Sequence, residues 1–272
     1  MAAGHRKRPR WGTVSGGGAG READGEVLEG GNVAEAVVRV GDTVRKPWRR
    51  SSPGVHSLLA HLEAHGYEGA PRTLGRDARG RQVLSYAPGT TADRMAPMTE
   101  RELYRLGRLI RALHDLAAAY EPPGETAWEV AVAPRGDELV CHHDLGPWNL
   151  VRDGPRWTFI DWDGAGPGTR MGDLGYAAHG FVPLHAGGVP GEDRRRLRAL
   201  ADGYGCDGAQ RRELPDAIGH EVRGMYDLLV EGARTGRRPW ARLHAEGHAD
   251  HWGPAAAYVE EHRNVWLAAL GL

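Results

Sequence analysis

The amino-acid sequence predicts an α+β fold, with a small antiparallel sheet at the start and a larger, mostly helical part after it. Valine-rich runs separated by glycines occupy residues 27–46, and another short strand pattern covers residues 81–86. Further along, apolar residues recur at helical spacing, first over residues 99–116. A chain of 272 residues is long for one compact unit. We therefore expect one lobe over residues 25–86 and a second over residues 87–272.

The bulk composition argues against several classes of protein. The formal net charge is −1, whereas a nucleic-acid-binding protein normally needs a basic face. No run of 18 apolar residues is present, and the first residues lack the apolar core of a signal peptide, so we expect no membrane partner. Cys141 and Cys206 make no disulfide framework, which favours the reducing cytoplasm. We expect a monomer or homodimer. Residues 1–24, rich in glycine and arginine, are expected to be a disordered tail.

The use of lysine sets one position apart. Lys7 and Lys46 are the two lysines of the chain, and the other 33 basic residues are arginines. An ammonium group is a compact point charge, whereas a guanidinium group is a wide planar fork, so the two are not interchangeable at a phosphate site. A lysine at the end of a predicted strand, in a chain that otherwise uses arginine, indicates that position 46 needs an ammonium group.

The first lobe is predicted as a three-stranded meander followed by a helix. Gly30 and Gly31 form the turn between the first two strands, and Lys46 lies on the third. The helix starts with a capping serine and a proline, and its buried stripe is Val55, Leu58, Leu59 and Leu62. His56 and Glu63 share one flank of this helix, so either could face Lys46. The charge of Glu63 favours it, and a solvated Glu63 is the alternative.

Two neighbouring segments in the middle of the chain each begin as an apolar strand and end in acidic residues. They cover residues 139–151 and 157–164, and Asp153-Gly154 between them predicts the tight turn of a hairpin. The hairpin would gather oxygen-bearing side chains at one edge, namely those of Asp144, Asn149, Asp161 and Asp163. Such ligands suit Mg²⁺, which binds through one or two carboxylates plus substrate phosphates.

The spacing of these residues matches a kinase catalytic loop. In the pattern His142-x-Asp144-x4-Asn149, the aspartate accepts the proton of the substrate hydroxyl and the asparagine holds Mg²⁺. The next strand ends in Ile-Asp-Trp-Asp instead of Asp-Phe-Gly, and His-x-Asp replaces His-Arg-Asp. With these features the chain resembles the aminoglycoside phosphotransferase and choline kinase-like family of small-molecule kinases. The resemblance is strong over residues 137–185 and looser over residues 25–135.

The resemblance implies a protein-kinase-like fold and transfer of the γ-phosphate of ATP or GTP, with Mg²⁺, to a hydroxyl group of a small molecule. The acceptor would be an antibiotic, such as an aminoglycoside, macrolide or nucleoside, or a metabolite. Lys46 would orient the phosphates, Asp144 would act on the acceptor hydroxyl, and Asn149 and Asp161 would hold the metal. The remaining roles would be supporting ones: loop ordering by His142, a brace at Asp173, metal binding or loop capping by Asp163, and nucleotide contacts from Gly30, Gly31, Leu84, Ser85 and Tyr86.

Other interpretations stay open on the residues alone. A metal-dependent hydrolase centred on His142, His143 and Asp144 explains the carboxylates, but it explains neither Asn149 nor Lys46. A pseudokinase that binds nucleotide without catalysis is disfavoured because all four key residues are present. The bulk of His143, where the resembling family usually has glycine, is expected to narrow the acceptor site. That site would be built by three helices, over 192–204, 209–233 and 254–271. A zinc site at His244, His248 and His251 has little support, since no carboxylate is placed as a base.

Overall fold

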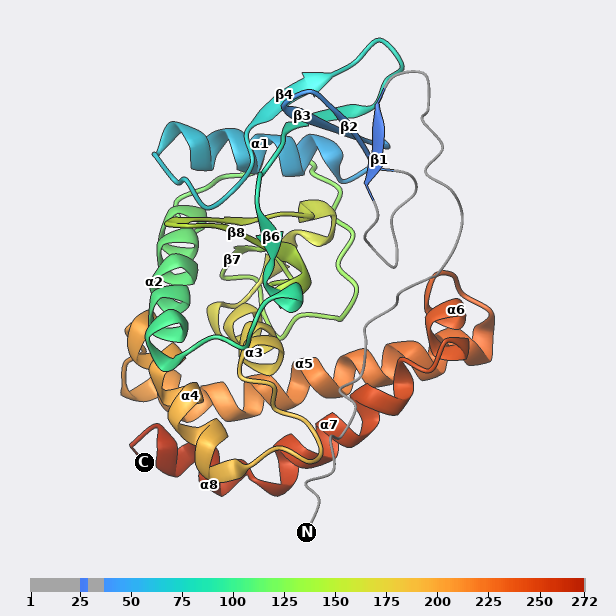
Figure 1. Ribbon diagram of the computed structural model, residues 1–272. Coiled ribbons are helices and arrows are strands. Elements are labelled where there is room, and N and C mark those ends of the chain that lie inside the picture. The colour runs from blue at the N-terminus through green and yellow to red at the C-terminus, as the bar shows by residue number, and fades with distance from the viewer. Residues whose placement is uncertain (1–24, 29–36, 272) are drawn as a thin grey trace.

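The structure is a computed structural model that describes residues 25–28 and 37–271. A five-stranded antiparallel sheet and one helix form one end of the molecule, and helices form most of the other end (Figure 1). This arrangement confirms the predicted fold class. The exact lobe boundary near residue 86 stays a prediction. The expected tail over residues 1–24 and the glycine turn at Gly30 and Gly31 lie outside the described residues.

The sheet of the first lobe has the strand order β1-β2-β3-β5-β4. The predicted meander is confirmed, because β1 pairs with β2 and β2 with β3 in antiparallel register. β4 was not predicted, since its four residues contain one apolar side chain and a glycine with φ of +83°. The elements of this lobe are β1 (Glu26–Leu28), β2 (Val37–Val40), β3 (Thr43–Lys46), α1 (Ser52–Ala64), β4 (Thr73–Arg76) and β5 (Gln82–Ser85).

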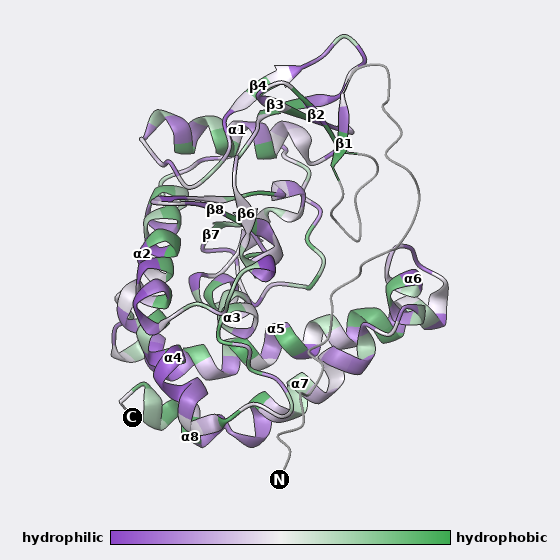
Figure 2. Cartoon of the chain, viewed as in Figure 1, coloured by the Kyte–Doolittle hydropathy of each residue, from purple (hydrophilic) through white to green (hydrophobic). Residues whose placement is uncertain are grey.

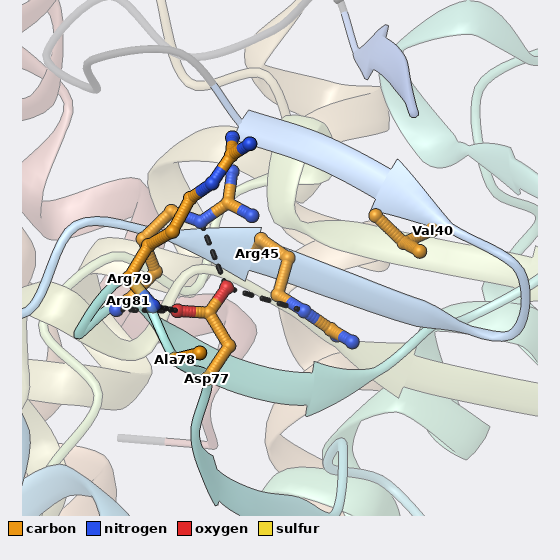
Figure 3. Close-up of a pocket in the computed structure, with 6 residues that line it drawn as sticks. All are labelled: Val40, Arg45, Asp77, Ala78, Arg79 and Arg81. Carbon is orange, nitrogen blue, oxygen red and sulfur yellow. Dashed lines mark hydrogen bonds and ion pairs between the residues drawn. The ribbon is translucent and has the colours of Figure 1, made fainter. Parts of the chain in front are cut away.

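A single carboxylate holds the turn between β4 and β5. Asp77 accepts hydrogen bonds from the backbone N–H groups of Arg79 and Arg81 and pairs with the Arg81 guanidinium at 2.9 Å. The Arg45 guanidinium of β3 lies 3.6 Å from the same carboxylate (Figure 3). These residues line a surface hollow of about 310 Å³. Asp77 partly neutralises the arginines around the hollow, including Arg45. We therefore assign these residues to stabilising the turn between β4 and β5.

α2 (Glu100–Ala117) links the two ends of the molecule, and its start is as predicted. The Thr99 hydroxyl accepts a hydrogen bond from the Glu102 backbone, and the Glu102 carboxylate accepts one from the Thr99 backbone. This capping box satisfies two N–H groups that the first helical turn leaves free. Figure 2 shows that α2 carries both hydrophilic and hydrophobic residues, as an amphipathic helix does. Its apolar face is buried through Leu103, Leu106, Ile110 and Leu113.

The predicted hairpin is confirmed in its second half and wrong in its first. β8 (Leu150–Asp153) and β9 (Arg156–Phe159) are antiparallel neighbours joined at Asp153-Gly154, and β6 (Thr90–Thr91) extends their sheet. β7 (Leu139–Cys141), which precedes the acidic loop, pairs instead with β10 (Gly166–Gly168). The loop therefore begins at one small sheet and ends at another. The acidic residues come together by this route and not at the end of one hairpin.

The helices of the second lobe follow the sequence pattern except near the end of the chain. The predictions for residues 192–204 and 209–233 are confirmed by α4 (Pro190–Tyr204) and α5 (Gly208–Thr235). The single helix expected over 254–271 is wrong, because the chain leaves helical geometry at His262 and the Trp266 indole N–H donates back to the Val259 carbonyl. The other helices are α3 (Arg170–Phe181), α6 (Trp240–Ala245), α7 (Ala249–Glu261) and α8 (Arg263–Ala269).

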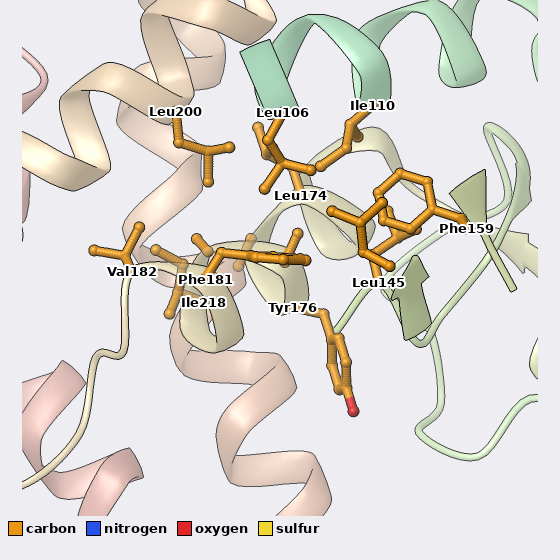
Figure 4. Packing of buried hydrophobic residues seen from close by; sticks show 14 of the residues in the cluster. Leu106, Ile110, Leu145, Phe159, Leu174, Tyr176, Phe181, Val182, Leu200 and Ile218 are labelled. Carbon is orange, nitrogen blue, oxygen red and sulfur yellow. The ribbon is translucent and has the colours of Figure 1, made fainter. Parts of the chain in front are cut away.

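The core of this lobe fixes α3 against its neighbours. Figure 4 shows apolar side chains of α2, α3, α4 and α5 packed in one group, with Phe159 of β9 and Leu145 of the acidic loop at one end of it, while the Tyr176 hydroxyl points away from them. A Cβ atom at Gly175 would lie 2.9 Å from the Ile218 backbone nitrogen, so α3 and α5 approach closely only because this residue is glycine. In the part of the chain that the structure describes, no helix is long and apolar enough to cross a membrane.

Two neutral histidines, His179 of α3 and His251 of α7, lie against each other. From their burial we expect the protein to lose stability in mild acid. The His179 Nδ1–H donates to the Leu184 carbonyl, and its Nε2 lies 3.3 Å from His251 Nε2. Burial lowers the pKa of His179 to about 3 and that of His251 to about 4. The neighbouring His185 lowers both pKa values further, and His248 lowers that of His251. Because the unfolded histidines bind protons below about pH 6.5, the unfolded state gains protons first and folding stability falls as the pH drops below that value.

The matched variant for this effect is His179→Asn, which keeps a donor for Leu184 but has no titrating ring. Between pH 7.5 and 5.5 the wild-type protein should lose about 1.4 kcal/mol more unfolding free energy than the variant, as one histidine that stays neutral only when folded requires. Urea denaturation at the two pH values measures this difference. Equal losses of unfolding free energy in both proteins would show that burial does not keep His179 neutral in the folded state.

Candidate active site

Asp144 lies in the loop between β7 and β8 with both carboxylate oxygens hydrogen-bonded. Asn149 Nδ2 donates to Oδ2 at 2.7 Å, and the Trp148 indole and the Tyr176 hydroxyl donate to Oδ1 at 3.1 and 2.9 Å. Burial, together with the nearby Asp161, raises the pKa of Asp144 to about 7, although these hydrogen bonds act in the opposite direction. The arrangement gives one oriented carboxyl group whose affinity for a proton suits a general base near neutral pH.

His142 is positioned to order this loop. Its ring is fully buried, with Nε2 3.0 Å from the Ile160 carbonyl, and its Nδ1 accepts the backbone N–H of Asp144 at 3.2 Å. Burial lowers the pKa of His142, so the neutral imidazole with one donor and one acceptor fits both contacts. Both ring nitrogens are thus occupied by backbone groups, one in the loop and one directly after β9.

Asp173 on α3 binds the start of the same loop. It accepts the backbone N–H groups of His142 and His143 at 3.1 and 2.8 Å, and His114 of α2 lies 3.1 Å from its Oδ2. Burial alone would raise the pKa of Asp173, but the His114 contact outweighs it and holds the value at about 2. The geometry is that of the expected brace. His114 is a partner that the sequence analysis did not assign.

His143 has an unusual backbone and faces away from Asp144. Its φ of +62° is a left-handed conformation that side chains with a Cβ seldom adopt, which is the physical reason why glycine suits this position. Its Nε2 lies 3.1 and 3.0 Å from the carbonyls of Gly166 and Pro167 in β10. The ring thus contacts the backbone of β10, and the effect of its bulk on the acceptor site stays a prediction.

Lys46 on β3 reaches across to the segment after β9. Its buried ammonium lies 2.6 Å from Asp161 Oδ1 and 2.9 Å from Asp163 Oδ2. Burial lowers the pKa of an ammonium, but the two carboxylates outweigh this and raise the pKa of Lys46. For Asp161, burial acts to raise the pKa, but the Lys46 ammonium outweighs it and lowers the value. Both groups are therefore charged at neutral pH.

Glu63 is not the partner of Lys46, and this expectation is wrong. Its carboxylate is 44% exposed and lies 4.0 Å from the Arg72 guanidinium. His56 faces the buried Gln82 instead, at 3.3 Å. Residues seven apart share a flank of a helix but are about 10.5 Å apart along its axis. His56, near the start of α1, contacts Gln82, the strand neighbour of Lys46, whereas Glu63 lies two turns further along. Periodicity thus gave a shared flank of the helix and no information on the distance.

The other expected nucleotide contacts are only partly described. Leu84 and Ser85 belong to β5, and the backbone N–H groups of Ser85 and Tyr86 donate to the carbonyls of Arg72 and Asp42. These residues lie where the chain leaves the sheet, and their contact with a base stays a prediction.

The sequence analysis missed four side chains near the expected catalytic groups. Trp148 and Tyr176 bind Asp144, while Gln82 and Arg49 lie beside Asp163. The only available signals were their positions: Trp148 directly precedes Asn149, and Arg49 follows Lys46 by three residues.

The donor set suits a hard cation shared with phosphate. Asn149 uses its Nδ2 on Asp144, so its amide oxygen takes no hydrogen bond from a described residue. Asp161 is bonded through Oδ1, and its side chain is 34% exposed. Among the described residues no three His, Cys, Asp or Glu side chains are grouped to hold a metal, and His251 contacts His179. The amide oxygen of Asn149 and the carboxylate of Asp161 are hard ligands of the kind that a divalent cation binds alongside water and phosphate.

Comparison with known proteins gives the family. A relative in Rhizobium leguminosarum bv. trifolii, named trifolitoxin immunity protein, is 32% identical over 260 residues, which cover 89% of this chain and 97% of the relative. The model of the phosphotransferase enzyme family matches residues 125–214, which contain the loop described above. The chain belongs to the phosphotransferase enzyme family. As such, it is a small-molecule phosphotransferase with a hydroxyl acceptor.

Solved structures of phosphotransferases share the fold. A microcompartment-associated aminopropanol kinase has a TM-score of 0.61 at 16% identity, with 91% of this chain and 93% of that one covered. A choline/ethanolamine kinase family protein from Mesorhizobium loti has a TM-score of 0.57 at 19% identity, with 90% and 92% covered. An amicoumacin kinase, in complex with AMP-PNP, Ca²⁺ and its antibiotic, has a TM-score of 0.60 at 13% identity, with 89% and 86% covered. The phosphotransferase fold of this chain thus extends over nearly all of its length.

Proposed function

We propose that this phosphotransferase moves the γ-phosphate of ATP or GTP to a hydroxyl group of a small antibiotic, with Mg²⁺ as the metal. The observation that carries the proposal is the meeting of Lys46 from the sheet with Asp161, beside the loop of Asp144 and Asn149. Phosphoryl transfer needs little covalent chemistry from the protein and depends on positioning and charge neutralisation. These four residues supply both.

Each residue takes one part of the reaction. Lys46 binds the α- and β-phosphates as a point charge. Asn149, through its amide oxygen, and Asp161 would hold Mg²⁺, which neutralises the charge of the phosphate oxygens. Asp144 orients the acceptor hydroxyl and accepts its proton as the oxygen attacks phosphorus. The Trp148 and Tyr176 hydrogen bonds keep the Asp144 carboxylate in one orientation for this step.

The antibiotic acceptor is supported by two relatives. The relative that is 32% identical is named an immunity protein, and one protein of the same fold is an amicoumacin kinase that was solved with a nucleotide analogue and a divalent cation. A hydrolase is not supported, because His142 and His143 both turn their rings to backbone carbonyls and leave no histidine pair for a metal. A pseudokinase is also disfavoured, because both Asp144 and Asn149 are in place.

The test is release of ADP or GDP from the purified protein with Mg²⁺ and a panel of hydroxyl-bearing antibiotics, including peptide, macrolide, nucleoside and aminoglycoside compounds. Turnover with one class, and mass spectrometry showing the acceptor gain one phosphate, would establish the activity. Nucleotide binding without turnover on any acceptor would favour the pseudokinase. Metal-dependent hydrolysis without nucleotide would favour the hydrolase.

Replacing Lys46 separates charge from shape. Lys46→Ala should lower kcat/KM for the nucleotide at least tenfold, since a charged hydrogen bond contributes about 1.5–3 kcal/mol. Lys46→Arg should restore little of this, because a planar fork does not fit a buried site built around an ammonium. Steady-state kinetics with varied nucleotide measures both. Wild-type kcat/KM in the arginine variant would show that the scarcity of lysine has no bearing on this site.

A further inference from the structure

Asp163 has a different set of partners from Asp161, although both contact Lys46. Asp161 accepts a hydrogen bond from the Lys46 ammonium at 2.6 Å, and its side chain is 34% exposed. Asp163 is 20% exposed and touches three groups: Lys46 at 2.9 Å, the Gln82 amide at 3.3 Å and the Arg49 guanidinium at 3.5 Å. Among the described residues, the Asp161 carboxylate is therefore hydrogen-bonded to Lys46 alone, whereas the Asp163 carboxylate is held from three directions.

The Gln82 amide is itself fixed. Gln82 is fully buried and is the direct neighbour of Lys46 across β3 and β5. Its Nε2 also donates to the Pro47 carbonyl at 2.9 Å, and its Oε1 lies 3.3 Å from His56 Nε2. The Thr73 hydroxyl of β4 contacts the other ring nitrogen of His56. This row of neutral side chains runs from β4 through α1 to the Asp163 carboxylate.

The direction of the hydrogen bonds in this row favours a charged acceptor at its end. Burial lowers the pKa of His56, so its ring is neutral. With Nε2–H donating to Gln82, His56 Nδ1 is free to accept from Thr73, and the Gln82 amide then donates to Asp163. Every donor thus points toward the carboxylate, and aligned hydrogen bonds strengthen one another in a buried setting.

We propose that Asp163 is the permanent partner of Lys46 and a positioning residue for it, whereas Asp161 leaves the lysine to bind the metal. The inference rests on the proposed function, because it assigns separate duties to the two carboxylates in nucleotide and Mg²⁺ binding. Asp163, held by Gln82 and His56, then keeps a buried ammonium paired when Mg²⁺ takes Asp161. An ammonium left buried without a partner would be costly.

The low lysine count allows a direct measurement on the nucleotide-free protein. With ¹³C at lysine Cε, the chain gives two signals, one from Lys46 and one from Lys7 as an internal reference. Asp163→Asn and Gln82→Leu should each shift the Lys46 signal and leave the Lys7 signal in place. Glu63→Gln should shift neither. The proposal would be overturned if the chemical shift of the Lys46 signal stayed unchanged in Asp163→Asn, or if it changed in Glu63→Gln.

Binding of ADP with and without Mg²⁺, measured by calorimetry, separates the two carboxylates. Wild type and Asp163→Asn should show the same ratio of the two Kd values within about twofold, while Asp161→Asn should lose the gain from Mg²⁺. Because Gln82 acts through Asp163, Gln82→Leu and Asp163→Asn should lower kcat/KM for the nucleotide by similar factors, each about tenfold. The double variant should be no worse than Asp163→Asn alone.

The two experiments distinguish the inference from the function on which it rests. Loss of the Mg²⁺ gain in Asp163→Asn would make Asp163 a metal ligand and contradict the inference, even if the protein is a kinase. Additive losses in the double variant would also contradict it, because Gln82 would then act independently. Failure of the wild-type protein to bind ADP or to turn over any acceptor would contradict the proposed function instead, and the Lys46 signal would still report on its partner.

Discussion

Asp144→Asn should lower kcat by about 10²–10⁴-fold while the affinity for nucleotide stays within about twofold of wild type. The change removes the proposed general base but keeps its shape, and general-base help is typically of this size. Because the interaction with the acceptor proton is made in the transition state, kcat and kcat/KM for the acceptor should fall by similar factors. Steady-state kinetics and calorimetry with Mg²⁺ and ADP measure the two quantities.

The matched control is Tyr176→Phe, which removes one hydrogen bond from Asp144 Oδ1 and leaves the carboxylate in place. Its effect on kcat should be several-fold, far below that of Asp144→Asn, because two other donors still orient the group. If Asp144→Asn lost nucleotide affinity but kept the kcat of the wild-type protein, Asp144 would serve the metal and not the acceptor.

Asp161→Asn should produce the opposite pattern. The affinity for Mg²⁺ should fall at least tenfold and turnover at ordinary Mg²⁺ should nearly vanish, since a hard cation loses a carboxylate ligand. Part of the activity should return when the Mg²⁺ concentration is raised, because a weakened site can still be filled by mass action. Activity measured against Mg²⁺ concentration tests this directly.

The comparison with Asp144→Asn makes the assignment of roles testable. Extra Mg²⁺ should not rescue Asp144→Asn, whose defect lies in proton transfer. Rescue of Asp144→Asn by Mg²⁺, with no rescue of Asp161→Asn, would mean that the two roles are reversed. Both variants should fold, because Asn keeps the volume of Asp and each position is partly exposed.

Local sequence patterns predicted the features that depend on neighbouring residues. The capping box at Thr99 and the turn at Asp153-Gly154 could be read from short stretches, and composition singled out Lys46, which the structure places beside Asp161. Spacing also predicted that Asp144 and Asn149 would be adjacent, because a five-residue loop cannot separate them widely.

Features that depend on distance between elements could not be read in this way. Periodicity placed Glu63 on the correct flank of α1 but two turns too far from Lys46, as the ion pair with Arg72 shows. Gln82 had no sequence signal, because its importance comes from strand register, which pairs it with Lys46. The break at His262 was hidden as well, since its cause is the packing of Trp266 back onto α7.

The close approach of α3 to α5 at Gly175 has a consequence for genetics. Asp173 and Tyr176 lie on either side of this glycine along α3, and they hold the start of the loop and Asp144. A larger residue at 175 would meet the Ala217–Ile218 backbone and displace the helix that carries both. In a mutational scan scored by phosphotransferase activity, Gly175 would therefore rank with residues that touch substrate, although it lies inside a helix contact.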